Sequence, residues 1–234
     1  MLLRHLHEDI QKINAIRDTI SALSNVTTQA GAINIIRATG AVQLEDRGLA
    51  GGRRTPGGSE QQSLVFRSKN GPYIAKIYPQ NDDSFTTYYN LCKSQAGKNV
   101  HLLRLAGDLI EVFDEKHNFN FNISFAEYVT PFTEVTRTNA SYFYPFMYAD
   151  GPDGPDFYAG GRQLSELVDL YWISVGDRVT RELTELFERR PTFKKFCATA
   201  YNHAVKGRSL QCDLHAGNVG FRSNGEMVVI DAFR

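Results

Sequence analysis

Hydrophobic positions recur every three or four residues over residues 2–23, and the positions between them are mostly polar. This spacing places the apolar side chains on one face of a helix, so the segment is predicted to be an amphipathic helix. Such a helix packs on the body of a domain or, as a second possibility, forms the contact of a homodimer. The apolar positions are Leu3, Leu6, Ile10, Ile13, Ile16, Ile20 and Leu23.

Alternating apolar and polar positions then predict strands over residues 62–68 and 73–78. Residues 84–94 are predicted to form a short helix. Two further strands are expected over residues 109–113 and 120–128, around a turn between them. The first half of the chain is therefore expected to form a small antiparallel sheet with one helix.

Glycine, proline, aspartate and tyrosine dominate residues 145–161, which predicts a long loop. After it, apolar positions at helical spacing predict one strong helix. Pro191 and Gly207 suit the first turn and the C-terminal cap of the next helix. Strands first and helices second indicate an α+β fold. The apolar positions of the strong helix are Leu164, Leu167, Val168, Tyr171, Val175, Val179, Leu183 and Leu186.

Charge and cysteine content narrow the function classes. The 234 residues include 26 basic and 26 acidic side chains, so charge gives no general attraction to nucleic acid or to an anionic membrane. No apolar run reaches the roughly 18 residues of a membrane span. The three cysteines show no paired spacing, which is typical of reduced thiols in a cytoplasm. We expect a cytoplasmic protein that binds neither nucleic acid nor membrane directly.

The C-terminal segment carries a hairpin signal. Asn224-Gly225 lies between two apolar runs, which predicts a two-residue type I′ turn. Such a turn fixes the register and would set Phe221 opposite Val228 and Asn218 opposite Asp231. Asp213 precedes the first strand by a short loop, so three oxygen-bearing side chains are expected near one point. Mg²⁺ prefers such ligands, and phosphoryl transfer needs a metal and a carboxylate that orients the attacking hydroxyl.

These residues also carry a family resemblance. Asp213-Leu214-His215-Ala216-Gly217-Asn218, followed by Val229-Ile230-Asp231, resembles the catalytic loop and metal motif of protein kinases and of aminoglycoside and choline kinases. The resemblance implies that Asp213 is the catalytic base and that Asn218 and Asp231 bind Mg²⁺. It also implies that His215 touches the transferring phosphate.

The same resemblance extends to the first half of the chain. Tyr73-Ile74-Ala75-Lys76-Ile77 resembles the strand that carries the ATP-contacting lysine, so Lys76 is expected to contact phosphate. Gly57-Gly58-Ser59 is the candidate phosphate loop, because bare backbone N–H groups can approach phosphates. By analogy, the backbone near Glu127 and Val129 would hold adenine.

The whole chain resembles the early serine/threonine protein kinases of short-tailed bacteriophages, with a Tyr-x-x-x-Cys run at Tyr88 to Cys92. The resemblance implies a minimal bilobal protein-kinase-like fold. We expect an N-terminal helix over residues 1–30, a small nucleotide-binding lobe over 31–130 and a helical lobe over 131–234. It further implies an ATP- and Mg²⁺-dependent kinase in the host cytoplasm that acts on host or phage proteins.

Two other interpretations stay open. A small-molecule kinase of the aminoglycoside or choline type would need an acidic pocket for a cationic substrate, which Asp150, Asp153 and Asp156 could supply. The second interpretation is a pseudokinase that binds and inhibits a host protein. It is suggested by the absence of a glutamate from residues 84–94 and by a chain that ends three residues after Asp231.

Overall fold

The computed structural model describes residues 16–44, 63–69, 73–132, 142–151, 154–174, 180–205 and 210–234. The chain forms two compact units. The first comprises Met1–Asp82 and Leu105–Tyr128, and the second comprises Asp83–Arg104 and Val129–Arg234. Helices and small antiparallel sheets are both present, as an α+β fold requires. Asp83–Arg104 thus clusters with the C-terminal residues, and the expected lobes (residues 1–30, 31–130 and 131–234) stay a prediction.

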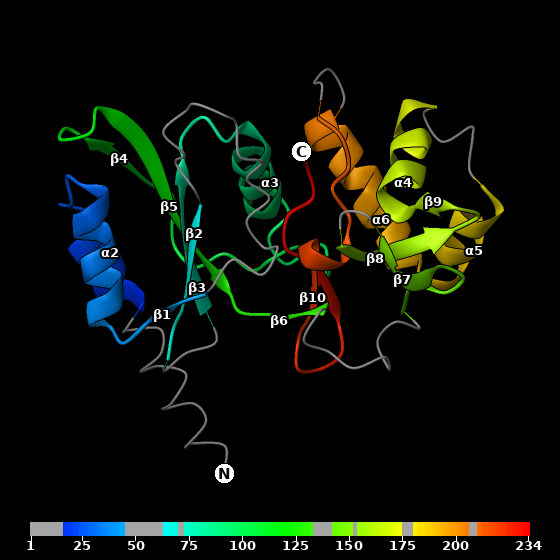
Figure 1. Ribbon diagram of the computed structural model, residues 1–234, viewed down its shortest axis with the longest axis horizontal. Coiled ribbons are helices and arrows are strands. Elements are labelled where there is room, and N and C mark those ends of the chain that lie inside the picture. The colour runs from blue at the N-terminus through cyan, green and yellow to red at the C-terminus, as the bar shows by residue number, and fades with distance from the viewer. Residues whose placement is uncertain are drawn as a thin grey trace, which may run out of the picture. The chain divides into compact units, whose positions relative to one another are not determined.

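The first unit is built on a five-stranded sheet in which every pairing is antiparallel. Figure 1 shows its long central strands side by side. The predicted strands of this half are all present. In order across the sheet the strands are β1 (Val42–Gln43), β2 (Leu64–Arg67), β3 (Tyr73–Pro79), β5 (Phe119–Glu127) and β4 (Ile110–Asp114).

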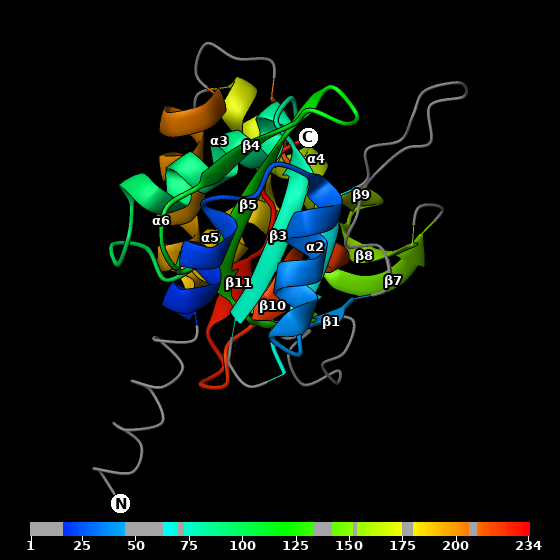
Figure 2. The same ribbon diagram turned by 90° about the vertical axis from the view of Figure 1, so that its left-hand side faces the viewer.

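Helix α2 (Gln29–Ala38) covers one face of this sheet, as Figure 2 shows. Ala32 and Ile36 on α2 are buried in the same hydrophobic core as Ile77 and Phe125 of the central strands. The helix begins at Thr28, whose hydroxyl accepts a hydrogen bond from the N–H of Gly31. The amphipathic side of α2 therefore closes the core of the first unit.

The described end of the predicted N-terminal helix also packs on this core. Residues 16–23 are helical, Leu23 is fully buried in the core, and Ile16 and Ile20 pack against it. The described part of this segment therefore packs on the body of the domain, which is the first of the two roles expected for its apolar face. Residues 2–15 lie outside the described part of the chain.

In the second unit, the segment predicted as a loop over residues 145–161 forms most of a three-stranded antiparallel sheet, so that prediction was wrong. The strands are β7 (Met147–Gly151), β8 (Gly154–Ala159) and β9 (Arg162–Gln163). Phe157 and Ala159 of β8 are buried while Tyr158 between them is less so, which is the period-2 pattern of a strand. The glycines and prolines hid this pattern.

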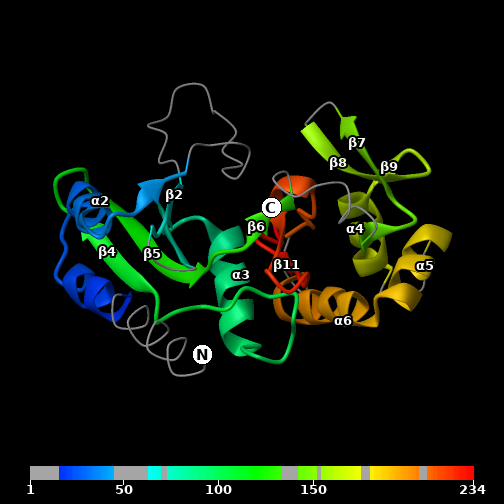
Figure 3. The ribbon, with the colours of Figure 1, turned by 90° about the horizontal axis from the view of Figure 1, so that it is seen from below.

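The predicted strong helix is in fact two helices, α4 (Leu164–Ile173) and α5 (Arg181–Arg189). The Ser174 hydroxyl donates to the carbonyl of Leu170 at the end of α4, and the Thr180 hydroxyl accepts from Leu183 N–H at the start of α5. These caps terminate and restart the helical pattern. Helix α6 (Pro191–Ala200) begins at the predicted proline and continues into a π-helical turn, η3 (Tyr201–Val205). Figure 3 shows α4, α5 and α6 beside the β7–β8–β9 sheet.

The C-terminal hairpin belongs to the same unit. Strands β10 (Val219–Phe221) and β11 (Met227–Val229) pair with each other, and β10 also pairs with β6 (Thr130–Pro131). The close approach of β6 requires Gly220, because a Cβ there would come within 2.9 Å of the Thr130 carbonyl oxygen. Helix α3 (Asp83–Ser94) packs in this unit as well, through the ring of Tyr88 against Phe233.

Among the described residues, no helix combines the length and the hydropathy that crossing a membrane requires.

Candidate active site

The hairpin that carries the predicted metal ligands has a different register from the predicted one. Val219 lies opposite Val229, and Phe221 lies opposite Met227, so Asn218 is level with Ile230 and not with Asp231. The prediction of Phe221 opposite Val228 was therefore wrong by one residue. A one-residue slip in a strand turns each side chain to the other face.

The turn explains the slip. The N–H of Gly225 donates to the carbonyl of Arg222 at 2.9 Å, and the N–H of Arg222 donates to the carbonyl of Glu226 at 2.9 Å. Gly225 has a φ of 83°, whereas Asn224 is not among the described residues with positive φ. A type I′ turn needs positive φ at both residues, so the loop is instead a type I turn followed by a glycine bulge. The Asn224 side-chain oxygen favours this turn by accepting from the N–H of Glu226 at 3.1 Å.

Asp231 nevertheless lies beside the other two site residues, because the backbone on each side of it is hydrogen bonded to them. The N–H of Ile230 donates to the carbonyl of Asn218 at 2.7 Å. The N–H of Asp213 donates to the carbonyl of Ala232 at 2.9 Å. Asp231 thus lies in the chain between the residues that make these two backbone hydrogen bonds. Its Oδ1 atom is buried.

Asn218 and Asp213 are joined directly. The side-chain Nδ2 of Asn218 donates to the Asp213 carbonyl at 2.9 Å and to Asp213 Oδ2 at 2.8 Å. Asn218 ends the short 3-10 helix η4 (Ala216–Asn218), and its N–H donates to the carbonyl of His215 at 3.0 Å. Since both side-chain bonds use Nδ2, the carboxamide oxygen Oδ1 is the atom of Asn218 that can bind a cation.

His215 faces the same carboxylate. Its Nδ1 accepts a hydrogen bond from the N–H of Gly217 at 3.0 Å, so Nδ1 carries no proton. The proton of the neutral ring is then on Nε2, which lies 3.8 Å from Asp213 Oδ2. The Asp213 side chain keeps 24% of its surface exposed, so a substrate hydroxyl could reach it.

Two further carboxylates lie close enough to interact with Asp213. Asp156 of β8 is buried, and burial raises its pKa to about 6; the Phe157 N–H opposes this, and the charges of Asp213 and Glu166 add to it. Asp169 of α4 accepts a hydrogen bond from the N–H of Cys212 at 2.7 Å, directly before Asp213. Burial raises the pKa of Asp169, against the opposing effect of that N–H. Asp156, Asp169 and Asp213 therefore form a group of three carboxyl groups in which the charge of Asp213 acts on the other two.

Sequence reasoning considered Asp156 only for a small-molecule kinase and missed Asp169. The available signal for Asp169 was its position in an otherwise apolar stretch, beside the buried Val168. Sequence reasoning also gave no role to Tyr88 beyond the resemblance, and it missed His101. Both contact β11.

The residues expected to bind the nucleotide do not all belong to one unit, and some lie outside the described residues. Lys76 lies on β3 in the first unit, with its Nζ 5.7 Å from the centre of the Tyr78 ring. Glu127 ends β5 in that unit, whereas Val129 is buried in the second unit. Gly57, Gly58 and Ser59 lie outside the described residues, as do Asp153 and the side chain of Asp150.

The donor set suits Mg²⁺ in its chemistry. Asn218 and Asp231 offer hard oxygen atoms, and Mg²⁺ completes its octahedron with water and phosphate oxygens. Among the described residues, no group of three or more His, Cys, Asp or Glu is arranged to hold a metal ion. The candidate set differs from such groups because one of its ligands is a carboxamide.

Comparisons with known proteins give little to add. No protein-family model matches the chain, and no curated protein matches it. One solved structure with some similarity is the crystal structure of a spectinomycin phosphotransferase in complex with ADP and spectinomycin, at 13% identity and a TM-score of 0.31. The match covers 78% of this chain and 62% of that chain, so this chain spans less than two thirds of its length.

Proposed function

We propose that this protein is a phosphotransferase that moves a phosphoryl group from ATP to a hydroxyl group and needs Mg²⁺. The observation that carries the proposal is the double hydrogen bond from Asn218 to Asp213, at the point where Asp231 joins the two backbone ladders. It brings a candidate base and two oxygen ligands together, in the sequence pattern that resembles kinase catalytic loops.

In this proposal each residue has one task. Asp213 accepts a hydrogen bond from the acceptor hydroxyl and orients its oxygen for attack. Asn218 Oδ1 and Asp231 would hold Mg²⁺, which when bound neutralises phosphate charge. His215 presents Nε2–H on the same side as the Asp213 carboxylate, where it can donate to a phosphate oxygen. Lys76, the backbone near Glu127 and Val129, and Gly57 to Ser59 are proposed to bind the nucleotide.

For the acceptor we propose a serine or threonine of a host or phage protein, met in the host cytoplasm, because the whole chain resembles the phage kinases. A cationic small molecule is the second candidate. Asp156 and Asp169 favour it, since the charge of Asp213 acts on both carboxyl groups and the three acidic side chains together would attract a cationic acceptor.

The proposal is tested by incubating the purified protein with γ-labelled ATP and Mg²⁺, together with either a bacterial lysate or a panel of aminoglycosides and amino alcohols. Wild-type protein and an Asp18→Asn control are expected to transfer label, because Asp18 is exposed and far from the site in sequence. Asp213→Asn is expected to lose activity by about 10²–10⁴-fold.

The distribution of label separates the acceptors. Labelled protein bands support the protein-kinase proposal, and label confined to small molecules supports the second candidate. Nucleotide binding without any transfer, unchanged by Asp213→Asn, would show a binding protein and overturn the enzymatic proposal.

A further inference from the structure

Strand β11, which leads into Asp231, uses only some of its backbone groups to pair with β10. In an antiparallel pair, hydrogen-bonded positions alternate with positions whose N–H and C=O point away from the partner. The N–H of Ile230 bonds to Asn218 and the carbonyl of Glu226 bonds to Arg222, so positions 226 and 230 face β10. Positions 227 and 229 therefore direct their backbone groups outward, to the side opposite β10.

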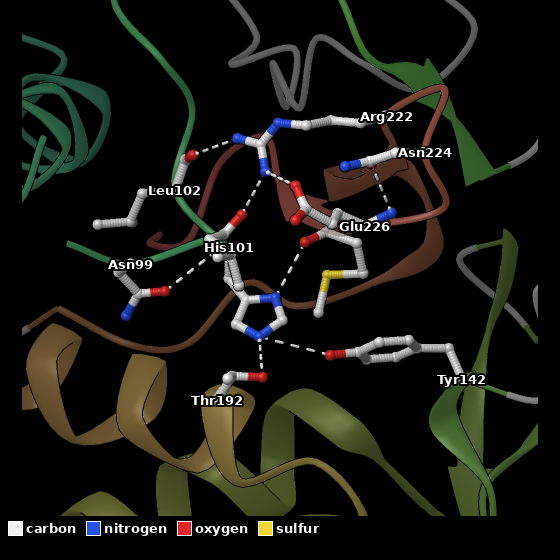
Figure 4. Close-up of polar contacts among 10 residues, drawn as sticks. Asn99, His101, Leu102, Tyr142, Thr192, Arg222, Asn224 and Glu226 are labelled. Atoms are coloured by element: carbon white, nitrogen blue, oxygen red, sulfur yellow. Dashed lines mark hydrogen bonds and ion pairs between the residues drawn. The ribbon is translucent and has the colours of Figure 1, made fainter. Parts of the chain in front are cut away.

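His101 takes two of these outward groups. Its carbonyl accepts from the N–H of Val229 at 2.8 Å, and its ring Nδ1 lies 2.9 Å from the carbonyl oxygen of Met227. A carbonyl only accepts, so Nδ1 carries the proton of the ring. Nε2 is then an acceptor for the hydroxyl of Thr192 at 2.9 Å. Figure 4 shows the His101 ring next to Thr192 and Tyr142.

Arg222 fastens the backbone around His101. Its guanidinium donates to the carbonyls of Val100 and Leu102 and forms an ion pair with Glu226 at 3.1 Å. Figure 4 shows the guanidinium between Leu102 and Glu226. The residues on both sides of His101 are thus attached to the turn of the same hairpin, which fixes where the His101 carbonyl lies.

Tyr88 of α3 takes a third outward group. Its hydroxyl donates to the carbonyl of Val229, and its ring meets the edge of Phe233 with centroids 6.3 Å apart. Tyr88 is fully buried, and both contacts lie within two residues of Asp231 in the sequence. Val229 is therefore held through its N–H by His101 and through its carbonyl by Tyr88.

We propose that Tyr88 and His101 are positioning residues that set the place of Asp231. The proposal rests on the proposed function, since it assigns these residues to the Mg²⁺-binding end of that site. With Val229 anchored on its outer side, and Ile230 and Ala232 bonded to the loop of Asn218 and Asp213, the backbone at Asp231 is fixed on both sides. Helix α3 lacks a glutamate, and Tyr88 gives it a direct hydrogen bond to the strand that carries the metal ligand.

The sharpest test is Tyr88→Phe, which removes one hydroxyl and keeps the ring packed on Phe233. Tyr144→Phe is the matched control, because Tyr144 is half exposed and outside the site. Loss of a partner that orients a metal ligand weakens metal binding by about 10–100-fold. We therefore expect Tyr88→Phe to raise the Kd for Mn²⁺ in the presence of ATP, measured by electron paramagnetic resonance, by about tenfold or more. Tyr144→Phe should leave it unchanged.

Two other readouts separate positioning from general stability. Hydrogen exchange of the peptide covering residues 227–233 should speed up in Tyr88→Phe at a temperature where circular dichroism shows full folding. Half-maximal activity should need more Mg²⁺, with the KM for the acceptor unchanged. For His101, Ala removes the ring donor, whereas Asn places an amide N–H near the position of Nδ1, so His101→Asn should recover part of the Mn²⁺ affinity that His101→Ala loses.

The outcomes are distinct. Wild-type activity with unchanged Mn²⁺ affinity in Tyr88→Phe, even if the Tm falls, would overturn the positioning role and leave the proposed function intact. Wild-type protein that binds no Mn²⁺ with ATP and transfers no phosphate would overturn both. Asp231→Asn provides the reference for lost metal binding.

Discussion

The carboxamide nitrogen of Asn218 hydrogen bonds to Asp213 twice, at 2.9 Å to its carbonyl oxygen and at 2.8 Å to its carboxylate. The two residues are five apart in the sequence, and the 3-10 turn between them closes the loop so that one side chain holds the other. The orientation of the candidate base therefore depends on Asn218.

Replacing Asn218 tests this dependence. Asn218→Ala removes both bonds and one candidate Mg²⁺ ligand, so we expect the kcat to fall by roughly 10–100-fold or more. The measurement is steady-state phosphate transfer across a range of Mg²⁺ concentrations. Asn90→Ala, on the exposed side of α3, is the control. Equal activity of the two variants would contradict a role for Asn218 in the site.

Asp156 should make stability depend on pH. Burial raises its pKa to about 6, above the ordinary value of 3.8, so the folded state keeps a proton that the unfolded state releases. The stability that the protonated group contributes is complete below pH 3.8 and is lost as the pH rises through 6. Asp156→Asn should therefore raise the Tm by a few degrees at pH 7.5 and have little effect at pH 4.

Thermal unfolding at these two pH values checks the prediction, with Asp18→Asn as the control for an exposed carboxylate. The Asn side chain keeps an oxygen that can accept from the Phe157 N–H, so the local hydrogen bond is retained. A gain of equal size at both pH values would rule out proton linkage as the cause.

His101 should give a dependence at lower pH. Burial lowers its pKa below 6.5, with Arg222 and Arg190 acting in the same direction and the Met227 carbonyl opposing them. The neutral His101 ring contributes its full stabilisation of the folded state above pH 6.5. This stabilisation is lost as the pH falls below 6.5 through the lowered pKa of the folded state, because the unfolded state binds the proton first. Urea unfolding at pH 7.5 and pH 5 should show a smaller difference between the two conditions in His101→Asn than in wild type. The same difference in both proteins would show that another group is responsible.

Asp114 should stabilise the first unit. Its fully buried carboxylate accepts from the N–H of Gln29 at 2.8 Å, at the start of α2, and from the N–H of His117 at 3.1 Å. Burial alone would raise the pKa of Asp114, but these donors and the His117 ring together lower it. Asp114→Ala leaves these two backbone donors without their acceptor and should lower the free energy of unfolding by about 1 kcal/mol. Urea unfolding beside Asp18→Ala provides the measurement and its control.

Local patterns were enough to predict strands β2, β3, β4 and β5 of the first unit, whereas helix α2 (Gln29–Ala38) and strand β1 (Val42–Gln43) were not predicted. The alternation of buried Tyr73, Ala75 and Ile77 is visible in the sequence and appears unchanged in β3. Pro191 marked the start of α6 in the same direct way. These elements depend on the periodicity of their own side chains, and that periodicity can be read from the sequence alone.

The rest was decided by the detailed geometry of turns and by contacts between distant residues. Asn224-Gly225 occurs in both type I′ turns and type I turns with a glycine bulge, and the choice here depends on the backbone bond of Arg222 to Glu226 and on the bond that the Asn224 side chain accepts from the Glu226 N–H. The β7–β8–β9 sheet is stabilised by burial of Phe157 against Phe132 and Phe143, far away in the sequence. The proximity of Asp213 and Asn218 was expected from their spacing, whereas Tyr88 and His101 reach β11 from more than 120 residues away.

The hydrogen bonds from His101 to β11 also affect how the edge of this sheet can aggregate. A strand at the edge of a sheet is a template on which a second chain can add, and proteins avoid aggregation by covering such edges. Here two residues cover the edge: His101 bonds through its carbonyl to the Val229 N–H and through its imidazole to the Met227 carbonyl, and the Tyr88 hydroxyl bonds to the Val229 carbonyl. The contacts proposed to position Asp231 thus also occupy backbone groups of β11 on which another copy of the chain could add.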